Sequence, residues 1–289
     1  GWDAEQLKPL LVALDELVPW LKQWHNEIDH EYGERLGDYY EGFLLEELRE
    51  LRVHDRSGHD EHGDESAVYP GRFPLGPALF GIPTLAEEID LIAGMDRSRG
   101  RTTGLYVEFK GPNLHWGRGM DIATIVLGVL AEKGYADKPQ QVYLQCFDGP
   151  TLQRLRHEIK TPLPLIQLIG ENSWGEDSDS DYDYMRTPEG LAQVASYADG
   201  IGPWLSQVYL GRNPAGELLL SDLASRAQAL GLAVHPYTFR RDELPAGVES
   251  FDELLDIFFN RAGVEGVFTD FPDTVRHYLQ REGYLSPVG

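Results

Sequence analysis

The stretch "MDIATIVLGVLAEKGYADKPQQVYLQCF" (Met120–Phe147) decides the fold class, because a helical segment in it is followed directly by a short apolar strand. The same order recurs six times after Thr84, and each strand ends in polar residues or a turn. Strict alternation at this spacing predicts parallel strands joined by crossover helices. Several strands are apolar on both faces, as a covered parallel sheet requires. The predicted strands span 103–110, 141–147, 164–169, 199–202, 232–239 and 266–271.

A barrel fits this pattern better than a doubly wound sheet. Polar residues follow almost every strand, and no glycine-rich phosphate loop follows the first one. We therefore expect an α/β, TIM-barrel-like (β/α) fold. A closed barrel of this kind needs eight strands, and six are recognisable in the sequence. The two that are not found are the first two, so we expect the barrel to be either incomplete or remodelled at its N-terminal end.

The expected domain organisation has two parts. Residues 1–66 form a helical, polar N-terminal segment, and residues 67–289 form the barrel-like catalytic domain. Leucines recur at spacings of three and four from Trp2 to Lys22, which predicts an amphipathic helix. A second helix is predicted over Gly42–Val53, and the charged stretch Arg56–Ser66 is predicted to be an exposed loop.

Composition excludes several classes of partner. The chain has 289 residues and a formal net charge of −23, so it repels phosphate backbones and anionic membranes, and nucleic acid is not an expected partner. The chain has a single cysteine, Cys146, so an intrachain disulfide is excluded. The cysteine content does not distinguish a cytoplasmic from an exported protein. We expect no membrane span, because no long apolar run exists. The first residues lack the basic and apolar regions of a signal peptide. No oligomeric state is predicted.

The stretch "GLYVEFKGPNLHW" (Gly104–Trp116) carries the first candidate site. An apolar run leads into Glu108 and Lys110, and a Gly-Pro pair then stops the strand. Alternate residues of a strand face the same side, so the carboxylate and the ammonium project together from its end. Strand ends are where barrels place their chemistry, although a surface ion pair would produce the same pattern.

From about Tyr69 to Leu279 the chain resembles the glycerophosphodiester phosphodiesterases, most closely the bacterial periplasmic type. The resemblance implies a TIM barrel that hydrolyses glycerophosphodiesters to an alcohol and glycerol 3-phosphate with a divalent cation, Ca²⁺ or Mg²⁺. It implies a periplasmic or extracellular location, and a cytoplasmic one stays open. The segments that carry the resemblance are "YPGRFPLG", "PTLAEEIDLI", "YVEFKGPNLHW", "DIATIVLGVLAEKGY", "VYLQCFD", "QLIGENSW", "YADGIGP", "VHPYTFRRDELP" and "AGVEGVFTDFPD".

The resemblance also assigns roles to residues. Glu108 matches a metal-ligating carboxylate, Lys110 matches a phosphate-facing lysine, and Tyr237 matches an aromatic residue that lines the substrate pocket. Two further substrate-binding candidates come from strand position. Gln145 lies near the end of its strand, where it contacts ligand or the barrel interior. His115 follows five residues after Lys110 of the Glu-x-Lys strand, and it either reaches the mouth of the barrel or lies on the protein surface.

The chain departs from the family pattern in its N-terminal part. The family has a His-Arg-Gly stretch, a Glu-x-Asp pair and a His-Asp histidine, and no His-Arg-Gly occurs here. Glu27 and Asp29 have the form of the metal-binding pair, and His25 is the candidate catalytic histidine. These two assignments cannot both hold. In the family the Glu-x-Asp pair precedes the His-Asp histidine, whereas here His25 precedes Glu27 and Asp29. The competing interpretation is that the charged stretch around His25, Glu27 and Asp29 is a solvent-exposed helix. His54, which is followed by an aspartate, is a second candidate for the catalytic histidine.

Two other hypotheses therefore stay open beside the hypothesis that the chain is an active phosphodiesterase. One is a non-catalytic or truncated barrel derivative that acts as a binding or scaffold protein. The other is an incomplete chain that lacks the first two strand–helix units. In an active chain we expect a rate well below that of the family, because only one of three metal ligands can be placed firmly and the first histidine is missing.

Overall fold

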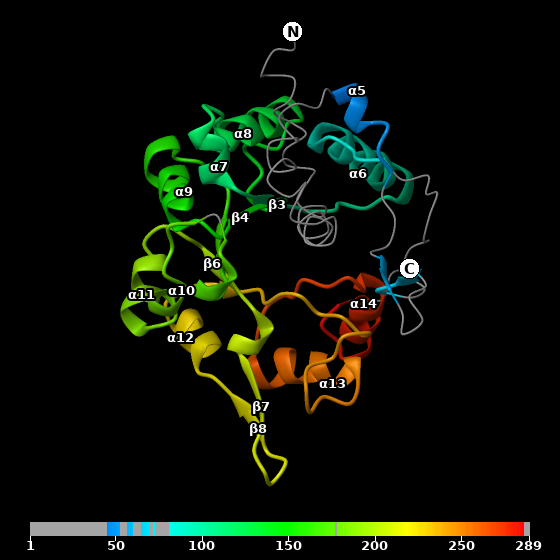
Figure 1. Cartoon of the computed structure of the whole chain (residues 1–289), viewed down its shortest axis with the longest axis vertical. Helices are drawn as coiled ribbons and strands as arrows, with labels where there is room; N and C mark the ends of the chain where they lie inside the picture. Colours follow the sequence, from blue (N-terminus) through cyan, green and yellow to red (C-terminus); the bar gives the residue numbers. More distant parts are fainter. Residues whose placement is uncertain are drawn as a thin grey trace. The chain divides into compact units, whose positions relative to one another are not determined.

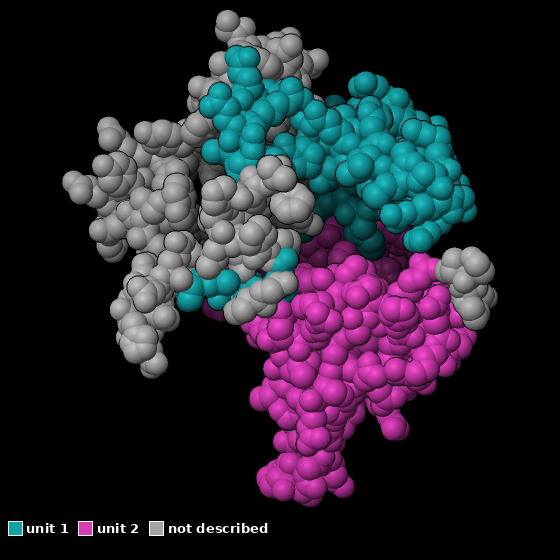
Figure 2. Space-filling view, turned by 90° about the vertical axis from the view of Figure 1, so that its right-hand side faces the viewer, with its two compact units in different colours: residues 1–141 teal, residues 142–289 magenta. Residues whose placement is uncertain are grey.

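The computed structural model describes residues 45–52, 57–59, 65–69, 72, 81–176 and 178–285. The chain divides into two compact units, residues 1–141 and residues 142–289, which are coloured separately in Figure 2. The predicted domain boundary near residue 66 stays a prediction, because much of the chain before it lies outside the described residues.

The described part of the N-terminal segment contains a short helix and a small hairpin. Helix α5 (Leu45–Leu48) falls inside the second predicted helix but covers only one turn of it. Strands β1 (Ser57–His59) and β2 (Glu65–Ala67) pair antiparallel, so the prediction of an exposed loop over 56–66 was wrong at these positions. Each strand has only three residues, which is too short to leave a periodic signal in a charge-rich sequence.

Helix α6 (Leu85–Arg99) opens the regular part of the first unit and has local signals at both ends. Thr84 accepts a hydrogen bond from the backbone of Glu87, whose carboxylate accepts one from the backbone of Thr84, so the two form a capping box. Gly100 ends the helix in the left-handed conformation, with φ of 59°.

The rest of the first unit consists of one strand and two helices. Strand β3 (Leu105–Phe109) is followed by the short helix α7 (Pro112–Gly117) and then by α8 (Ile122–Glu132). Helix α8 begins at Asp121, whose side chain caps the backbone of Thr124. The core of this unit holds apolar side chains from α6, β3 and α8 that are almost completely buried: Ile89, Phe109, Ile122, Val126 and Leu130.

The second unit is built on parallel strands, as predicted. Strand β5 pairs with β4 on one side and β6 on the other, and β6 pairs with β9, each pair parallel. These four strands come in sequence order, which is the arrangement of successive strand–helix units (Figure 1). The strands are β4 (Val142–Cys146), β5 (Leu165–Ile169), β6 (Gly200–Pro203) and β9 (Ala233–Val234).

Helices connect and follow these strands (Figure 1). Helix α9 continues into a π-helical stretch, Leu155–Ile159, and α13 continues into another, Ile257–Ala262. Short 3₁₀ turns lie at Asn172–Trp174 and Leu205–Gln207. The α-helices are α9 (Gly149–Arg154), α10 (Tyr182–Met185), α11 (Pro188–Val194), α12 (Leu223–Ala229), α13 (Phe251–Asp256) and α14 (Pro272–Arg281).

Glycines at alternate positions of β6 have a packing reason. A Cβ atom at Gly200 would lie 2.7 Å from Cδ1 of Ile166 and 2.8 Å from the carbonyl oxygen of Ala233. At Gly202 a Cβ atom would lie 2.6 Å from Cδ2 of Leu168. The β5 side chains therefore occupy the space above β6, and only glycine fits under them.

Two features of the second unit differ from the strand predictions. The segment 266–271 is not a regular strand, although Phe268 and Asp270 exchange backbone hydrogen bonds with Pro236 and Phe239 around one parallel bridge at Thr269. The fifth predicted strand, 232–239, is regular only at Ala233–Val234 and then makes isolated bridges. The unit also has a hairpin of β7 (Tyr209–Arg212) and β8 (Leu218–Leu220), which projects from it in Figure 1.

Among the described residues, no helix is long and apolar enough to cross a membrane. Cys146 is fully buried in the apolar core of the second unit, and its sulfur accepts a hydrogen bond from the backbone amide of Asp148.

Candidate active site

Glu108 and Lys110 lie at the end of β3, where the sequence predicts them. Leu105, Val107 and Phe109 are buried on one face of the strand, so the alternate residues project from the other. Nζ of Lys110 lies 3.6 Å from Oε1 of Glu108, and the two side chains are 20% and 22% exposed. A pair this well covered is not the freely solvated surface pair that the sequence left open.

His115 follows in α7 and is buried, with 8% of its surface exposed. Gly111 precedes the helix in the left-handed conformation, with φ of 55°, and Pro112 occupies its first turn. The backbone carbonyl of His115 accepts hydrogen bonds from the amides of Arg118 and Met120. The surface alternative for this histidine was therefore wrong, and its role in binding substrate stays a prediction.

Gln145 lies on β4 and its side chain is 7% exposed. In the sheet register it pairs with Ile166, and Ile166 pairs with Gly200, so these residues share one face of the second unit's sheet. Its Oε1 atom is buried and accepts no hydrogen bond from the described part of the chain. A buried acceptor of this kind is unusual in a folded protein and marks a position where a donor group would bind favourably.

Tyr237 lies just beyond β9 and is fixed in place by hydrogen bonds. Its hydroxyl donates to the carbonyl of Ile169 at 2.9 Å, and its backbone amide donates to Pro203 at 3.1 Å. Its ring meets Phe147 edge to face, with centroids 5.8 Å apart. The half-buried ring therefore lies at the carboxyl ends of β4, β5 and β6.

His235 lies two residues before Tyr237 and is also half-buried. Its ring lies edge to face against Tyr143, with centroids 5.8 Å apart. Burial lowers the pKa of His235 below its usual 6.5, and the nearby carboxylate of Glu265 opposes this shift. The ring contact and the burial together indicate that His235 has a packing role in the second unit.

Gln167 is a residue that the sequence reasoning missed. It is fully buried in β5, on the face opposite to Gln145. Its amide nitrogen donates to the carbonyls of Phe147 and Leu168, each at 2.9 Å, and its Oε1 accepts from the hydroxyl of Tyr197 at 2.8 Å. Burial also raises the pKa of the Tyr197 hydroxyl. The available signal was a polar residue in the middle of the apolar run "LIQLI".

A second missed group lies directly after β5. The carboxylate of Glu171 accepts from Arg186 at 3.0 Å and from the side-chain amide of Gln207 at 2.9 Å. The same amide donates to the carbonyl of Gly170 at 2.7 Å. Arg186 also pairs with Asp183. These contacts hold the acidic loop after β5 against the end of that strand. No pattern in the sequence predicts them.

The candidates fall into three sets. Glu108 and Lys110 adjoin in the first unit, which also contains His115. Gln145 and Tyr237 belong to the second unit. The candidates from the N-terminal segment, His25, Glu27 and Asp29, lie outside the described residues, as do His54 and the aspartate after it.

The described residues supply only part of a site for a divalent cation. The Glu108 carboxylate is the kind of hard oxygen ligand that Ca²⁺ and Mg²⁺ take. Within the described residues, no group of three or more His, Cys, Asp or Glu side chains lies close enough to hold a metal ion. Further ligands would have to come from elsewhere in the chain, and two of the predicted ones are in its undescribed part.

Comparison with known proteins confirms the family and the fold that the sequence predicts. The sequence profile described as the glycerophosphoryl diester phosphodiesterase family matches residues 24–274. The match begins upstream of the motif-by-motif resemblance and includes His25, Glu27 and Asp29. The fold is TIM-barrel-like, and a Silicibacter pomeroyi crystal structure, provisionally assigned as a glycerophosphoryl diester phosphodiesterase, has a TM-score of 0.54 at 22% identity, covering 83% of this chain and 69% of that chain.

Two curated relatives are similar over most of the chain. A Haemophilus influenzae protein named glycerophosphodiester phosphodiesterase is 37% identical over 259 residues, which cover 84% of this chain and 71% of that protein. A Treponema pallidum protein of the same name is 32% identical over 249 residues, which cover 81% of this chain and 70% of that protein. The chain therefore belongs to the glycerophosphoryl diester phosphodiesterase family.

Proposed function

We propose that this chain is an enzyme that hydrolyses small-molecule glycerophosphodiesters to an alcohol and glycerol 3-phosphate. The observation that carries the proposal is the pair formed by Glu108 and Lys110 at the end of β3, inside the matched family range. A phosphodiester is anionic, and this chain has a net charge of −23, so binding requires positive charge placed locally. Lys110 supplies one such charge.

Each candidate has a role in the proposed reaction. In the first unit, Lys110 binds a phosphate oxygen and His115 is a further substrate-binding residue. In the second unit, Gln145 and Tyr237 are the candidates for contact with substrate. Water forms the new bond to phosphorus as the bond to the alcohol oxygen breaks. His25 gives a proton to the departing alkoxide.

A divalent cation, Ca²⁺ or Mg²⁺, is part of the proposal, with Glu108, Glu27 and Asp29 as its ligands. When bound, such an ion neutralises charge on the phosphate oxygens. The half-buried Glu108 carboxylate supports this role. Nζ of Lys110 lies 3.6 Å from that carboxylate and places a positive charge beside it.

The proposed enzyme comprises a barrel-like catalytic domain over 67–289 that follows the polar segment 1–66. The family resemblance supports a periplasmic or extracellular location. The alternative is a non-catalytic barrel that binds the same phosphodiesters.

The test is to incubate the purified chain with glycerophosphoglycerol and Ca²⁺ or Mg²⁺, and to measure release of glycerol 3-phosphate. The proposal expects release that a chelator abolishes and that added metal restores. In His25→Ala the rate should fall by roughly 10² to 10⁴-fold, because a positioned general acid contributes about that much. Binding of the diester without any release would support the non-catalytic alternative. An unchanged rate in His25→Ala would place the general acid elsewhere.

A further inference from the structure

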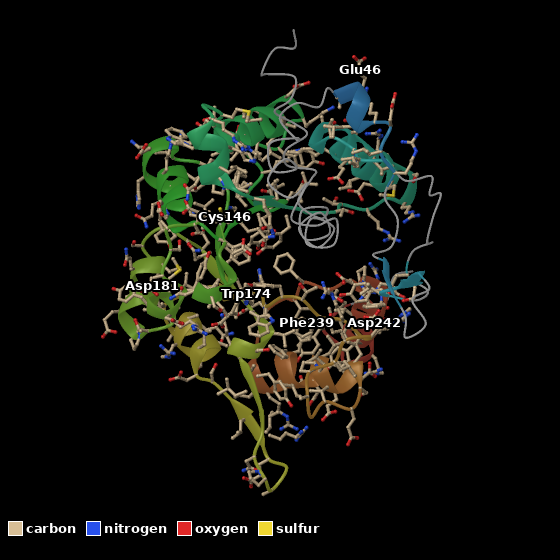
Figure 3. All side chains as sticks on the ribbon, in the orientation of Figure 1. Glu46, Cys146, Trp174, Asp181, Phe239 and Asp242 are labelled. Carbon is tan, nitrogen blue, oxygen red and sulfur yellow. The ribbon has the colours of Figure 1, made fainter. Side chains whose placement is uncertain are left out.

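The hairpin of β7 and β8 carries apolar side chains that the second unit does not bury. It projects from the unit in Figure 1, and in Figure 3 the side chains at its far end stand apart from the rest of the unit. Leu210 in β7 and Leu219 in β8 are 57% and 42% exposed, and Leu218 and Leu220 are half-buried. Three consecutive leucines make both faces of β8 apolar, although an exposed strand is normally polar on its solvent face.

The hairpin is attached to the unit through β7. The hydroxyl of Tyr209 donates to the carbonyl of Ala246 at 2.9 Å. The Arg212 side chain donates to the carbonyl of Gly247 at 2.9 Å and pairs with Glu253 at 2.5 Å. Strand β8 consists of three leucines, so it has no polar side chain that could make such bonds. The projecting arm therefore has a fixed base, and β8 is its less attached strand.

Strand β8 also offers an edge for pairing. Strands β7 and β8 form a sheet of two strands, so no other described strand pairs with either of them. A hairpin on its own is marginally stable in water, and an unpaired apolar edge is a ready template for a further strand. The position across from Leu219 is open as well, because its register partner is Gly211, where an added Cβ atom would meet nothing within 4 Å.

Charge favours a second copy of this chain as the partner of the hairpin. The whole chain carries a net charge of −23, so most surfaces of two copies repel each other. Residues 208–221 contain one arginine and one glutamate and are net neutral. Two copies can therefore approach each other through their hairpins and remove the exposed leucines from water without opposing a large charge.

A lipid surface fits the hairpin less well, because the turn over 213–217 would have to enter the membrane first. That turn is polar: Oδ1 of Asn213 accepts from the amides of Ala215 and Glu217, and Nδ2 of Asn213 donates to the Glu217 carboxylate. The leucines lie along the strands and not at the turn. Segments that insert into a membrane interface present aromatic and basic side chains there, and this turn has neither.

We propose that β8 forms a dimer interface, in which it pairs antiparallel with β8 of a second copy about a two-fold axis at Leu219. The same residues then meet from both sides, and the two Leu219 side chains become a cross-strand pair in a four-stranded sheet. A stable dimer normally buries about 800 Å² on each partner, and a three-residue edge offers less. We therefore expect a weak, reversible dimer with Kd on the order of 10–100 μM. This inference does not depend on the proposed function.

Sedimentation velocity of the purified chain from about 1 to 300 μM should show this monomer–dimer equilibrium. Leu219→Lys should raise Kd by at least about tenfold, because both copies lose an apolar contact and place like charges opposite each other. Leu230→Lys is the matched control, since Leu230 is 44% exposed in the same unit and lies outside the hairpin. An equal mixture of Leu219→Lys and Leu219→Glu should associate again, because opposite charges then meet at the axis.

A cysteine at the axis provides a milder probe. The native Cys146 is fully buried, so Leu219→Cys presents one accessible thiol. Cross-strand neighbours lie within reach of a disulfide, so mild oxidation at dimer concentrations should link two copies of Leu219→Cys much faster than two copies of Leu230→Cys.

A wild-type chain that stays monomeric over the whole range would overturn the inference, whether or not it binds phosphatidylcholine vesicles. A Leu219→Lys variant that dimerises as well as the wild type would also overturn it. A lysine–glutamate mixture that stays monomeric, or equal cross-linking of the two cysteine variants, would show that the two copies do not meet at Leu219.

Discussion

Lys110 lies beside Glu108 at the end of β3, with Nζ 3.6 Å from Oε1 and both side chains largely covered by the protein. The pair therefore places a carboxylate and an ammonium group together at one strand end. This is the arrangement that a phosphodiester with a metal counter-ion requires.

Replacing Lys110 by Gln should raise KM for glycerophosphodiesters by roughly tenfold or more, because a charged hydrogen bond to phosphate is lost. Michaelis–Menten kinetics on glycerophosphoglycerol measure this change. Lys133→Gln is the control, since Lys133 pairs with Asp90 at 2.6 Å in the same unit and has no proposed contact with substrate. An unchanged KM in Lys110→Gln would remove the lysine from the phosphate site.

Replacing Gln167 by Leu should lower the free energy of unfolding by about 2–4 kcal/mol, because the buried carbonyls of Phe147 and Leu168 and the Tyr197 hydroxyl all lose a partner. Tyr197→Phe removes only the last of these bonds and should cost about 1 kcal/mol. Urea denaturation of both variants and of the double variant measures their coupling. Strictly additive effects would mean that the Gln167–Tyr197 hydrogen bond contributes nothing.

His235 should make the chain less stable in mild acid. Burial lowers its pKa in the folded state, so below pH 6.5 the unfolded chain binds a proton that the folded chain does not. Its contribution to stability is complete above pH 6.5 and is lost as pH falls from there toward the folded pKa. Thermal denaturation between pH 7.5 and about 5 should therefore show a larger loss for the wild type than for His235→Gln. Parallel curves for the two proteins would contradict this assignment.

Parallel strand–helix order could be predicted from the sequence because covered parallel strands leave a clear pattern. "VYLQC" and "LIQLI" are apolar on both faces, and each follows a helical segment. The segment 266–271 pairs with residues 236–239 through a parallel bridge at Thr269 and adjoining backbone hydrogen bonds, but it does not form a regular strand. Short pairings of this kind depend on tertiary contacts, and the same holds for the hairpin of β1 and β2.

The candidate site was predictable where it depends on one strand end, and not where it depends on several. Alternation along "YVEFK" was enough to place Glu108 and Lys110 on one side of β3. No local pattern could predict that Gln207 reaches Glu171, or that Gly170 lies between Trp174 and Phe147. These contacts join residues from different loops, and only the folded sheet brings them together.

The most direct test of the account is the rate of glycerol 3-phosphate release by Glu108→Gln at saturating Ca²⁺ or Mg²⁺, compared with Glu132→Gln, an exposed glutamate of the same unit. Glutamine keeps the shape of the side chain and removes its charge. The account predicts that Glu108→Gln loses at least about 100-fold in kcat/KM and also needs more metal for half-maximal rate, while Glu132→Gln behaves like the wild type. A Glu108→Gln enzyme with the rate and metal requirement of the wild type would contradict the central claim that Glu108 and Lys110 form the active site.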